Sequence, residues 1–264
     1  MTELAAITTE RHGKKVWKKV PGYAFAGSET VIPLVGAELG KAALAMPIGF
    51  IKQDAGYQLV AITSLKPGTN LYVAPDGEWL GKYIPAALRT YPFKLTQQEG
   101  SHESILCINE ASALVVDSEE DGNAFFDDQD KPAQGIKDIL SILLKVEVSR
   151  TATQGAVNAL ADAGLITPWA LNLKQGEEVV PVKGLFHVDE PALNKLDDEG
   201  FLTLRKAGGL ACAYAQLLSM EQIVLLERLG KLRGQILAQQ AAKSEASNLT
   251  GFSLAEDEGS LNFD

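Results

Sequence analysis

The chain has 264 residues, of which 46% are hydrophobic, and it carries a formal net charge of −10 at pH 7. A chain of this length can bury a full core without disulfides or a structural metal. The acidic balance argues against a nucleic-acid partner, because a phosphate backbone is bound by clustered Lys and Arg.

Residues 1–20 are predicted to form an N-terminal arm that enters the fold near Trp17. The arm holds a cluster of basic residues, which we interpret as a solvated terminal segment, the alternative being a weak contact with an acidic partner or membrane surface. The cluster comprises Arg11, Lys14, Lys15, Lys18 and Lys19. The N-terminus lacks the apolar stretch of a secretory signal, so the expected location is the cytoplasm, with signal-independent export left open.

Residues 20–130 are predicted to be β-rich. Short runs of β-branched and aromatic residues alternate with Pro- and Gly-containing turns, which is typical of an antiparallel sheet. The expected strands are Val31–Val35, Ile48–Ile51, Tyr57–Thr63, Asn70–Val73 and Ser104–Asn109, with Leu114–Asp117 as a further candidate. Two short helices are expected between the strands, at Gly36–Leu44 and Ile84–Thr90, with Pro85 starting the second.

Residues 131–243 are predicted to be a helical region of the same globular unit, because apolar residues recur at helical spacing from Ile136 onwards. Gly164 predicts a helix end, and Asp189 is expected to cap another helix. Val179–Val182 and Leu185–Val188 are expected to pair as a hairpin or an edge. The whole pattern predicts an α+β fold, with a mostly antiparallel, β-rich N-terminal region packed against a helical C-terminal region.

A last long helix is predicted from about Ser219 to Ala242, followed by a disordered acidic tail at residues 244–264. The helix carries apolar residues at steps of four, three and four, which is typical of a short coiled-coil seam. These residues are Leu225, Leu229, Leu232 and Ile236. A homodimer through this seam and intramolecular packing both remain open. No window approaches 18 consecutive apolar residues, so no membrane span is expected.

An acidic segment has the spacing of a calcium-binding loop. Asp117, Glu119, Asp121 and Asp128 stand at positions one, three, five and twelve, and Gly122 is at position six. The last position is Asp where such loops place Glu, and the residues before the segment look extended and not helical. A solvated acidic turn is therefore the preferred interpretation, and we expect no metal.

The sequence contains no recognisable catalytic set, so we expect no catalytic residue and no cofactor. His12, His102 and His187 are scattered and lack an accompanying nucleophile or metal motif. An enzyme remains the alternative if the fold brings His187 together with four acidic residues. Those acids are Asp76, Glu78, Asp189 and Glu190.

The segment Asn70–Leu95 concentrates aromatic residues around a Pro-Asp-Gly turn. Such rings suit either a binding surface or an ordered wall of the core. The candidate binding residues are Trp79, Tyr83, Arg89 and Tyr91, with Asp76 in the turn. Arg89 is expected to hold a carboxylate, either of the protein or of a ligand.

Three blocks of sequence carry a family resemblance. They are Asn70–Val73 with Asp76–Trp79 and Tyr83–Phe93, then Leu106–Asn109 with the turn Ser118–Gly122, and finally Gly184–Glu190 with the positions from Leu193 to Ser219. Together they resemble the bacterial SapC family over about residues 20–225. Asn109 stands where the family pattern has an acid, and Thr90 stands where it has a second basic residue.

The resemblance implies an accessory protein. The family takes its name from loci for a paracrystalline surface layer, and many members look like accessory proteins encoded near outer-membrane receptors and flavin-dependent halogenase-like enzymes. The family supplies no catalytic residue. We therefore expect a non-enzymatic accessory or binding protein with a protein, peptide or saccharide-related partner. The alternatives are an enzyme that uses convergent carboxylates and a structural protein associated with the surface layer.

Overall fold

The computed structural model describes residues 3–97, 104–117, 121–175 and 178–253. Its architecture is α+β, as predicted, with antiparallel sheets in the N-terminal region and helices towards the C-terminus. The two kinds of element pack on each other, because strands with one apolar face need a second layer to bury it.

The largest sheet has five antiparallel strands in the order β10-β13-β4-β5-β3. Its strands are β3 (Val31–Pro33), β4 (Ile48–Gln53), β5 (Gly56–Ile62), β10 (Ile166–Pro168) and β13 (Leu185–Val188). A tight turn joins β4 to β5, and Gly56 takes a φ of +119° there, which a side chain would strain. The last strands of the sheet come from the distant segment 166–188, so the helical region contributes to the sheet.

Two three-stranded sheets contain the N-terminal segment, so the predicted arm is wrong. One has the order β1-β7-β6 and the other β8-β2-β9. Their strands are β1 (Leu4–Ala6), β2 (Lys15–Trp17), β6 (Phe93–Gln97), β7 (Ser104–Asn109), β8 (Val115–Asp117) and β9 (Asn123–Ala124). The short helix α1 (Thr9–His12) joins β1 to β2. Val16 and Trp17 are buried, which gives the segment an apolar reason to stay in place.

Two further strand predictions differ from the structure. β12 (Glu178–Val182) pairs with β11 (Leu171–Gln175), whereas β13 joins the large sheet, so β12 and β13 do not form a hairpin. Asn70–Val73 is not a strand, because the buried Asn70 side chain holds the chain in a turn. Its amide donates to the carbonyl of Ala26 and accepts from the backbone N–H of Tyr72, both at 3.0 Å.

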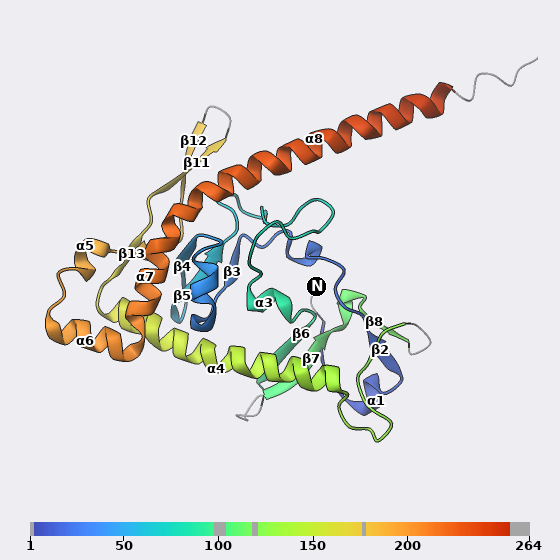
Figure 1. The fold of residues 1–264 in the computed structure, drawn as a ribbon, viewed down its shortest axis with the longest axis horizontal. Helices are drawn as coiled ribbons and strands as arrows, with labels where there is room; N and C mark the ends of the chain where they lie inside the picture. The colour runs from blue at the N-terminus through green and yellow to red at the C-terminus, as the bar shows by residue number, and fades with distance from the viewer. Residues whose placement is uncertain (1–2, 98–103, 118–120, 176–177, 254–264) are drawn as a thin grey trace, which may run out of the picture.

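Helix α4 (Gln134–Asp162) runs along the molecule from the β2–β8 side to the large sheet (Figure 1). The longer helices that follow are α6 (Asp198–Ala207), α7 (Gly209–Ser219) and α8 (Ile223–Ser253). The shorter helices are η1 (Ala24–Ala26), η2 (Gly36–Glu38), α2 (Leu39–Ala42), α3 (Ala86–Arg89), η3 (Glu110–Ser112), α5 (Glu190–Leu193) and η4 (Met220–Gln222). Asp189 caps α5 by accepting a hydrogen bond from the N–H of Ala192, as predicted.

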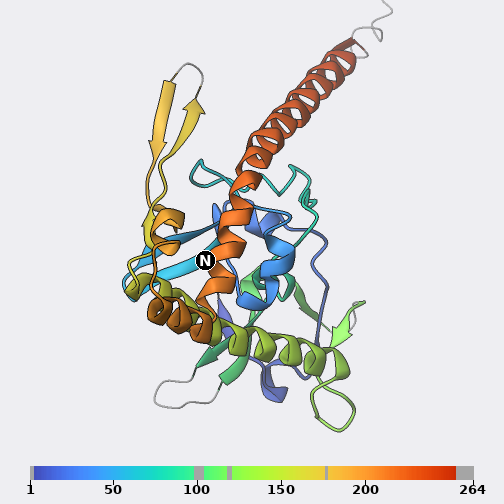
Figure 2. The same cartoon turned by 60° about the vertical axis from the view of Figure 1, so that its left-hand side comes forward.

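The C-terminal half of α8 projects away from the body of the molecule (Figures 1 and 2). Arg233 fastens the helix where it leaves, because its guanidinium donates to the carbonyl of Val73 at 2.6 Å. Helix α8 continues to Ser253, so the predicted disordered tail is helical over its first ten residues, and residues 254–264 lie outside the described part. Of the predicted seam, Leu229 is buried in the core, whereas Leu232 is 41% exposed.

Among the residues that the structure describes, one helical stretch, Gly209–Lys243, is long and apolar enough to cross a membrane by length and composition. Its most apolar window has a mean hydropathy of 1.4, and 33% of that window is buried in the fold. Core helices of globular proteins meet the same criterion, and α7 packs its Cys212 and Ala213 into the core. Both cysteines of the chain, Cys107 and Cys212, are buried free thiols.

The buried side chains form two clusters. The large core lies between the five-stranded sheet, the C-terminal half of α4 and α7, and includes Phe50, Leu59 and Leu160. The small core lies under β2, β6 and β7 and the N-terminal half of α4. It consists of Trp17, Phe93, Ile108, Phe125, Ile136 and Leu143.

Candidate functional site

A cleft of about 640 Å³ lies where the two cores meet. One wall is formed by residues 31–35 of β3 and its extension, the opposite wall by residues 90–95 of β6 and its approach, and a third side by α4. Much of the buried lining is apolar, including Leu34, Leu88 and Leu143, and its buried polar residues are Glu38, Thr90, Asn109 and Thr153. A hollow of this size and character is typical of a small-ligand or peptide site.

The walls of the cleft are fixed by hydrogen bonds from α4. Thr153 Oγ1 accepts from the N–H of Gly36 at 2.6 Å, and Gln154 Nε2 donates to the carbonyl of Tyr57 at 2.9 Å. These bonds hold η2 and β5 against the helix, because each satisfies a backbone group that would otherwise be left unpaired. The cleft is therefore built on regular elements.

Charged groups at the α4 side of the cleft are paired with each other. Arg150 donates to both carboxylate oxygens of Glu147, at 2.8 and 2.6 Å. Those hydrogen bonds lower the pKa of Glu147 and raise that of Arg150. The two side chains are 37% and 57% exposed, so the pair contributes little to stability and is accessible from solvent.

Glu38 is a buried carboxylate in the lining of the cleft, only 5% exposed. It accepts hydrogen bonds from the N–H of Val35 (3.1 Å), the hydroxyl of Tyr83 (2.8 Å) and the N–H of Ala86 (2.6 Å). Burial, followed by the bond to Glu38, raises the pKa of Tyr83 to about 12. A buried carboxylate needs hydrogen-bond donors, and Glu38 has three. Because one of them is the N–H of Ala86 in α3, Glu38 links α3 to η2.

A stacked pair of rings separates the cleft from a second hollow of about 280 Å³. The rings of Phe25 and Tyr91 lie 3.8 Å apart with 7° between their planes, and both residues line both hollows. Asn109 Nδ2 approaches the hydroxyl of Tyr91 at 3.4 Å, and Asn109 Oδ1 accepts from the N–H of Glu3. Asn109 therefore connects the N-terminal strand to this partition.

Two of the five predicted binding residues line a hollow. Tyr91 belongs to the partition, and Asp76 lines the smaller hollow from its turn, where it accepts from the N–H of Glu78 at 3.0 Å. Trp79 is half-buried and packs on Tyr72 and Tyr23, with ring centroids 5.3 and 5.5 Å away. Its Nε1 donates to the carbonyl of Tyr83 at 2.9 Å, so the ring is tied into the wall of the core.

The remaining two residues lie beside each other at the surface. Arg89 is exposed, and its guanidinium carbon lies 5.8 Å from the centre of the Tyr83 ring, a cation–π geometry. It also donates to the hydroxyl of Tyr83 at 3.4 Å. The carboxylate that we expected beside Arg89 is instead bound by Tyr83, which stands between Arg89 and Glu38.

The acidic segment lies between two strands of one sheet. Asp117 ends β8 and pairs with Lys15, and β9 follows on the other side of β2. Glu119 falls outside the described residues, while Asp121 and Asp128 are exposed. Within the described ranges, no three His, Cys, Asp or Glu side chains gather in a way that could hold a metal ion.

The residues of the enzyme hypothesis have local structural roles. Asp189 caps α5, and Asp76 closes its turn with Glu78. His187 lies in β13 with its ring centre 5.7 Å from that of Trp169, and burial lowers its pKa. His102 lies outside the described residues.

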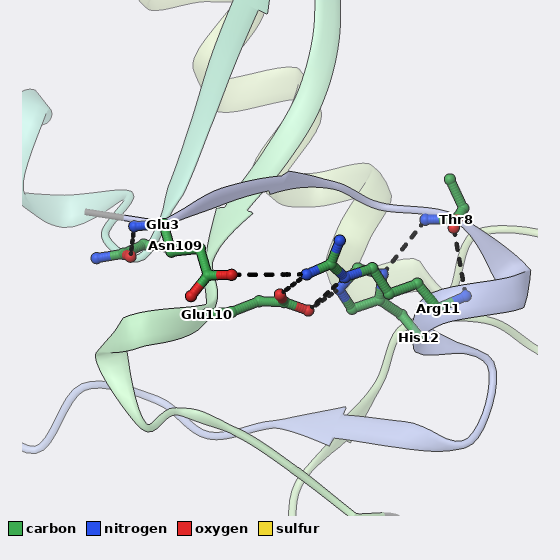
Figure 3. Close-up of polar contacts among 6 residues, drawn as sticks. All are labelled: Glu3, Thr8, Arg11, His12, Asn109 and Glu110. Carbon is green, nitrogen blue, oxygen red and sulfur yellow. Dashed lines mark hydrogen bonds and ion pairs between the residues drawn. The ribbon is translucent and has the colours of Figure 1, made fainter. Parts of the chain in front are cut away.

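A cluster of polar residues fixes the N-terminal segment and was not predicted from sequence (Figure 3). Arg11 binds Glu110 through two hydrogen bonds, one of them from Nε to Oε1 at 2.9 Å. The buried His12 accepts from the N–H of Thr8 at Nδ1 (3.3 Å), and its Nε2 lies 3.3 Å from Glu110 Oε1 without hydrogen-bond geometry. An Nδ1 that accepts a hydrogen bond belongs to a neutral imidazole, and burial lowers the pKa of His12 accordingly.

A family model described as SapC matches residues 7–226 of the chain. This range includes β2, the small core, the start of α8, the cleft lining except Leu4 and the large core except Leu229. No curated protein and no solved structure matches the chain significantly.

Proposed function

We propose that this chain, which belongs to the SapC family, is a non-enzymatic binding protein that holds part of a partner in the cleft. The observation that supports the proposal most is the cleft itself, an apolar hollow of about 640 Å³ between two sheets and a long helix. Binding sites of globular proteins are typically preformed, concave and mostly apolar.

The polar groups of the cleft favour binding over chemistry. Glu38 has three hydrogen-bond donors on its carboxylate, and Arg150 and Glu147 satisfy each other. Groups that are held in this way orient the walls and the rim of a site, whereas an acid or base in catalysis must reach a substrate proton. The partner that we propose is a protein, peptide or saccharide-related ligand, met in the cytoplasm.

A pair of variants on one helix tests whether the cleft is the binding site. Val146 lines the cleft, whereas Val148 is 74% exposed on the same helix and is not part of the lining. We expect Val146→Trp to fill the hollow and Val148→Trp to leave it open. The probes are a random peptide library displayed on phage and an immobilised glycan array, each screened with the wild-type protein.

The expected result is at least one class of probe that binds the wild type and Val148→Trp but not Val146→Trp. Thermal unfolding of the three proteins shows whether the fold is retained. Probes that bind Val146→Trp as well as the wild type would contradict the proposal, because binding would then lie elsewhere on the surface.

A further inference from the structure

The free backbone edge of β6 faces the cleft, and we propose that it binds an extended polypeptide segment as an added strand. This inference rests on the proposed function and specifies both the class of partner and the way in which it is recognised. Addition of a strand to an exposed sheet edge uses main-chain hydrogen bonds for affinity and side-chain pockets for specificity.

Strand β6 is at the edge of its sheet, since the strand order is β1-β7-β6. The N–H of Asn109 donates to the carbonyl of Pro92, and the ladder then pairs Lys94 with Cys107 and Thr96 with Ile105. Hydrogen-bonded and non-hydrogen-bonded pairs alternate in an antiparallel ladder. The N–H and C=O of Leu95 therefore point away from β7, as does the C=O of Phe93.

The opposite wall is also a sheet edge. Strand β3 is last in the five-stranded sheet, and the bonds from Leu34 to Leu59 and from Thr63 to Thr30 fix its pattern. The backbone groups of Val31 and Pro33 consequently point away from β5. Pro33 has no N–H, so β3 offers one outward N–H, that of Val31, whereas the longer strand β6 continues to Gln97 and offers two outward N–H groups, those of Leu95 and Gln97. We therefore assign the pairing to β6.

Consecutive residues of β3 and β6 line the cleft, together with Gln58 and Leu59 of β5, Leu4 of β1 and Asn109 of β7. Residues 31–35 line it without a gap, and so do residues 90–95. Alternate side chains of a strand point to opposite faces of its sheet, so one face would contribute only every second residue. An unbroken run of lining residues is expected when the edge of the strand borders the hollow.

The side chains around the cleft suit an apolar extended segment. A bound strand presents alternate side chains to two sides, and the cleft has apolar groups on both, Leu143 and Val146 from α4 and the Phe25–Tyr91 stack. A saccharide would instead need the polar side chains of the lining, among them Gln58 and Lys94, around its hydroxyl groups. The charged pair at the rim, Glu147 and Arg150, is already bonded to itself.

Two variants at one position isolate the backbone donor of β6. Leu95→Pro removes the outward N–H without removing a bond of the β6–β7 ladder, and Leu95→Ala removes the side chain but keeps the N–H. The probe is a synthetic peptide of about ten residues, selected against the wild-type protein from the displayed library. We expect Leu95→Pro to weaken its binding about tenfold more than Leu95→Ala does.

Modified probes test the same pairing on the unaltered protein, so the test does not depend on the folding of Leu95→Pro. Two sets of the selected peptide are made, one N-methylated at its odd-numbered amides and the other at its even-numbered amides. We expect one set to lose binding and the other to keep it, because only alternate amides of an added strand face β6.

Equal binding by both methylated sets would overturn the inference, since recognition would then use side chains alone. A glycan that binds the wild type but not Val146→Trp, with no peptide selected, would also overturn it while leaving the proposed binding function intact. If every probe bound Val146→Trp as well as it bound the wild type, the proposed function itself would be contradicted.

Discussion

The large and the small core differ in how their buried polar groups are satisfied. In the large core, Gln216 accepts from the N–H of Val188 and donates to the carbonyl of Ile48, and Ser219 accepts from the N–H of Ile48. In the small core region, His12 Nε2 and Trp17 Nε1 are buried without a hydrogen-bond partner among the described residues. On the side of the large core, His187 Nδ1 is likewise buried without a hydrogen-bond partner among the described residues.

The large core can therefore serve as the stable scaffold of the chain, with the small core attached to it less firmly. Unsatisfied buried polar atoms cost stability, and two of the three among the described residues lie in the small core region, whereas the hydrogen bonds of Gln216 and Ser219 fix the large core. We therefore expect the large core to set the stability of the whole chain and the small core to open first. The cleft lies at the boundary between the two, which places a binding site beside the region that opens more easily.

The largest effect is expected at the centre of the large core. Phe50 is fully buried in β4, so Phe50→Ala should lower the free energy of unfolding by about 3–5 kcal/mol. The loss should reach both cores, because α4 packs in each. Urea unfolding followed by circular dichroism measures the loss of stability. A loss restricted to one part of the transition would show that the large core does not set the stability of the whole chain.

A slightly smaller effect is expected at Trp79, which packs at the margin of the large core. Trp79→Ala should cost about 3 kcal/mol, because it removes two ring contacts and the bond to Tyr83. Arg89→Ala is the matched control and should change stability by less than about 0.5 kcal/mol, since Arg89 is exposed. If Trp79→Ala were as stable as the wild type, the aromatic segment would not belong to the core.

A more local effect is expected in the small core. Leu143→Ala should cost about 2 kcal/mol, at the low end for a buried leucine, because its site borders the cleft and can relax. Native-state hydrogen exchange should show faster exchange in β6 and β7, with β4 and β5 unchanged. Equal acceleration in all four strands would mean that the two cores open as one unit.

The smallest effect is expected from mild acid, and it should act mainly on the small core region. Burial lowers the pKa of His12 below its ordinary 6.5, so the unfolded chain binds a proton more readily and stability falls as the pH drops below about 6.5. Glu110, Arg11, Lys15 and Glu3 surround this site. We expect the free energy of unfolding to fall between about pH 7.5 and pH 5.5 because of His12.

His12→Asn is the variant that checks this assignment, because its amide oxygen can still accept from Thr8 but does not titrate. Its stability should fall less over the same pH range than that of the wild type. The remaining decline should come from His187, whose pKa is also lowered by burial. Glu110 contributes only at lower pH, since the hydrogen bond from Arg11 lowers its pKa below 4.5. An unchanged pH dependence in His12→Asn would rule out this histidine as the cause.

Much of the fold could be predicted from local sequence. β4, β5 and β7 were expected because alternating β-branched residues lie between Pro- and Gly-containing turns, and the Asp189 cap because its short side chain precedes a proline. The N-terminal segment was not recognised, because β1 and β2 are three residues long and are held by partners about a hundred residues away. Pairing over such a distance leaves no local signal.

The cleft itself could not be predicted. Its walls come from three separate segments, around Leu34, Phe93 and Leu143, and its character depends on which strands lack a neighbour. The sequence predicts Tyr91 as a binding residue only as one of several aromatic residues, because its stacking on Phe25 follows from the tertiary fold. The role of Glu38 has no signal in the sequence, because a single acid in a short helix gives the same local sequence whether it faces solvent or three hydrogen-bond donors.

Helix α4 contributes to the small core through Ile136, to the cleft through Val146 and to the large core through Leu160. An occupant of the cleft that binds only the folded chain adds its binding free energy to folding, by about 2.7 kcal/mol at a hundred times its Kd. Because the same helix supports both cores, that gain should slow the opening of the small core and raise the melting temperature of the large one together. Thermal denaturation therefore serves as a general detector of whatever fills the cleft.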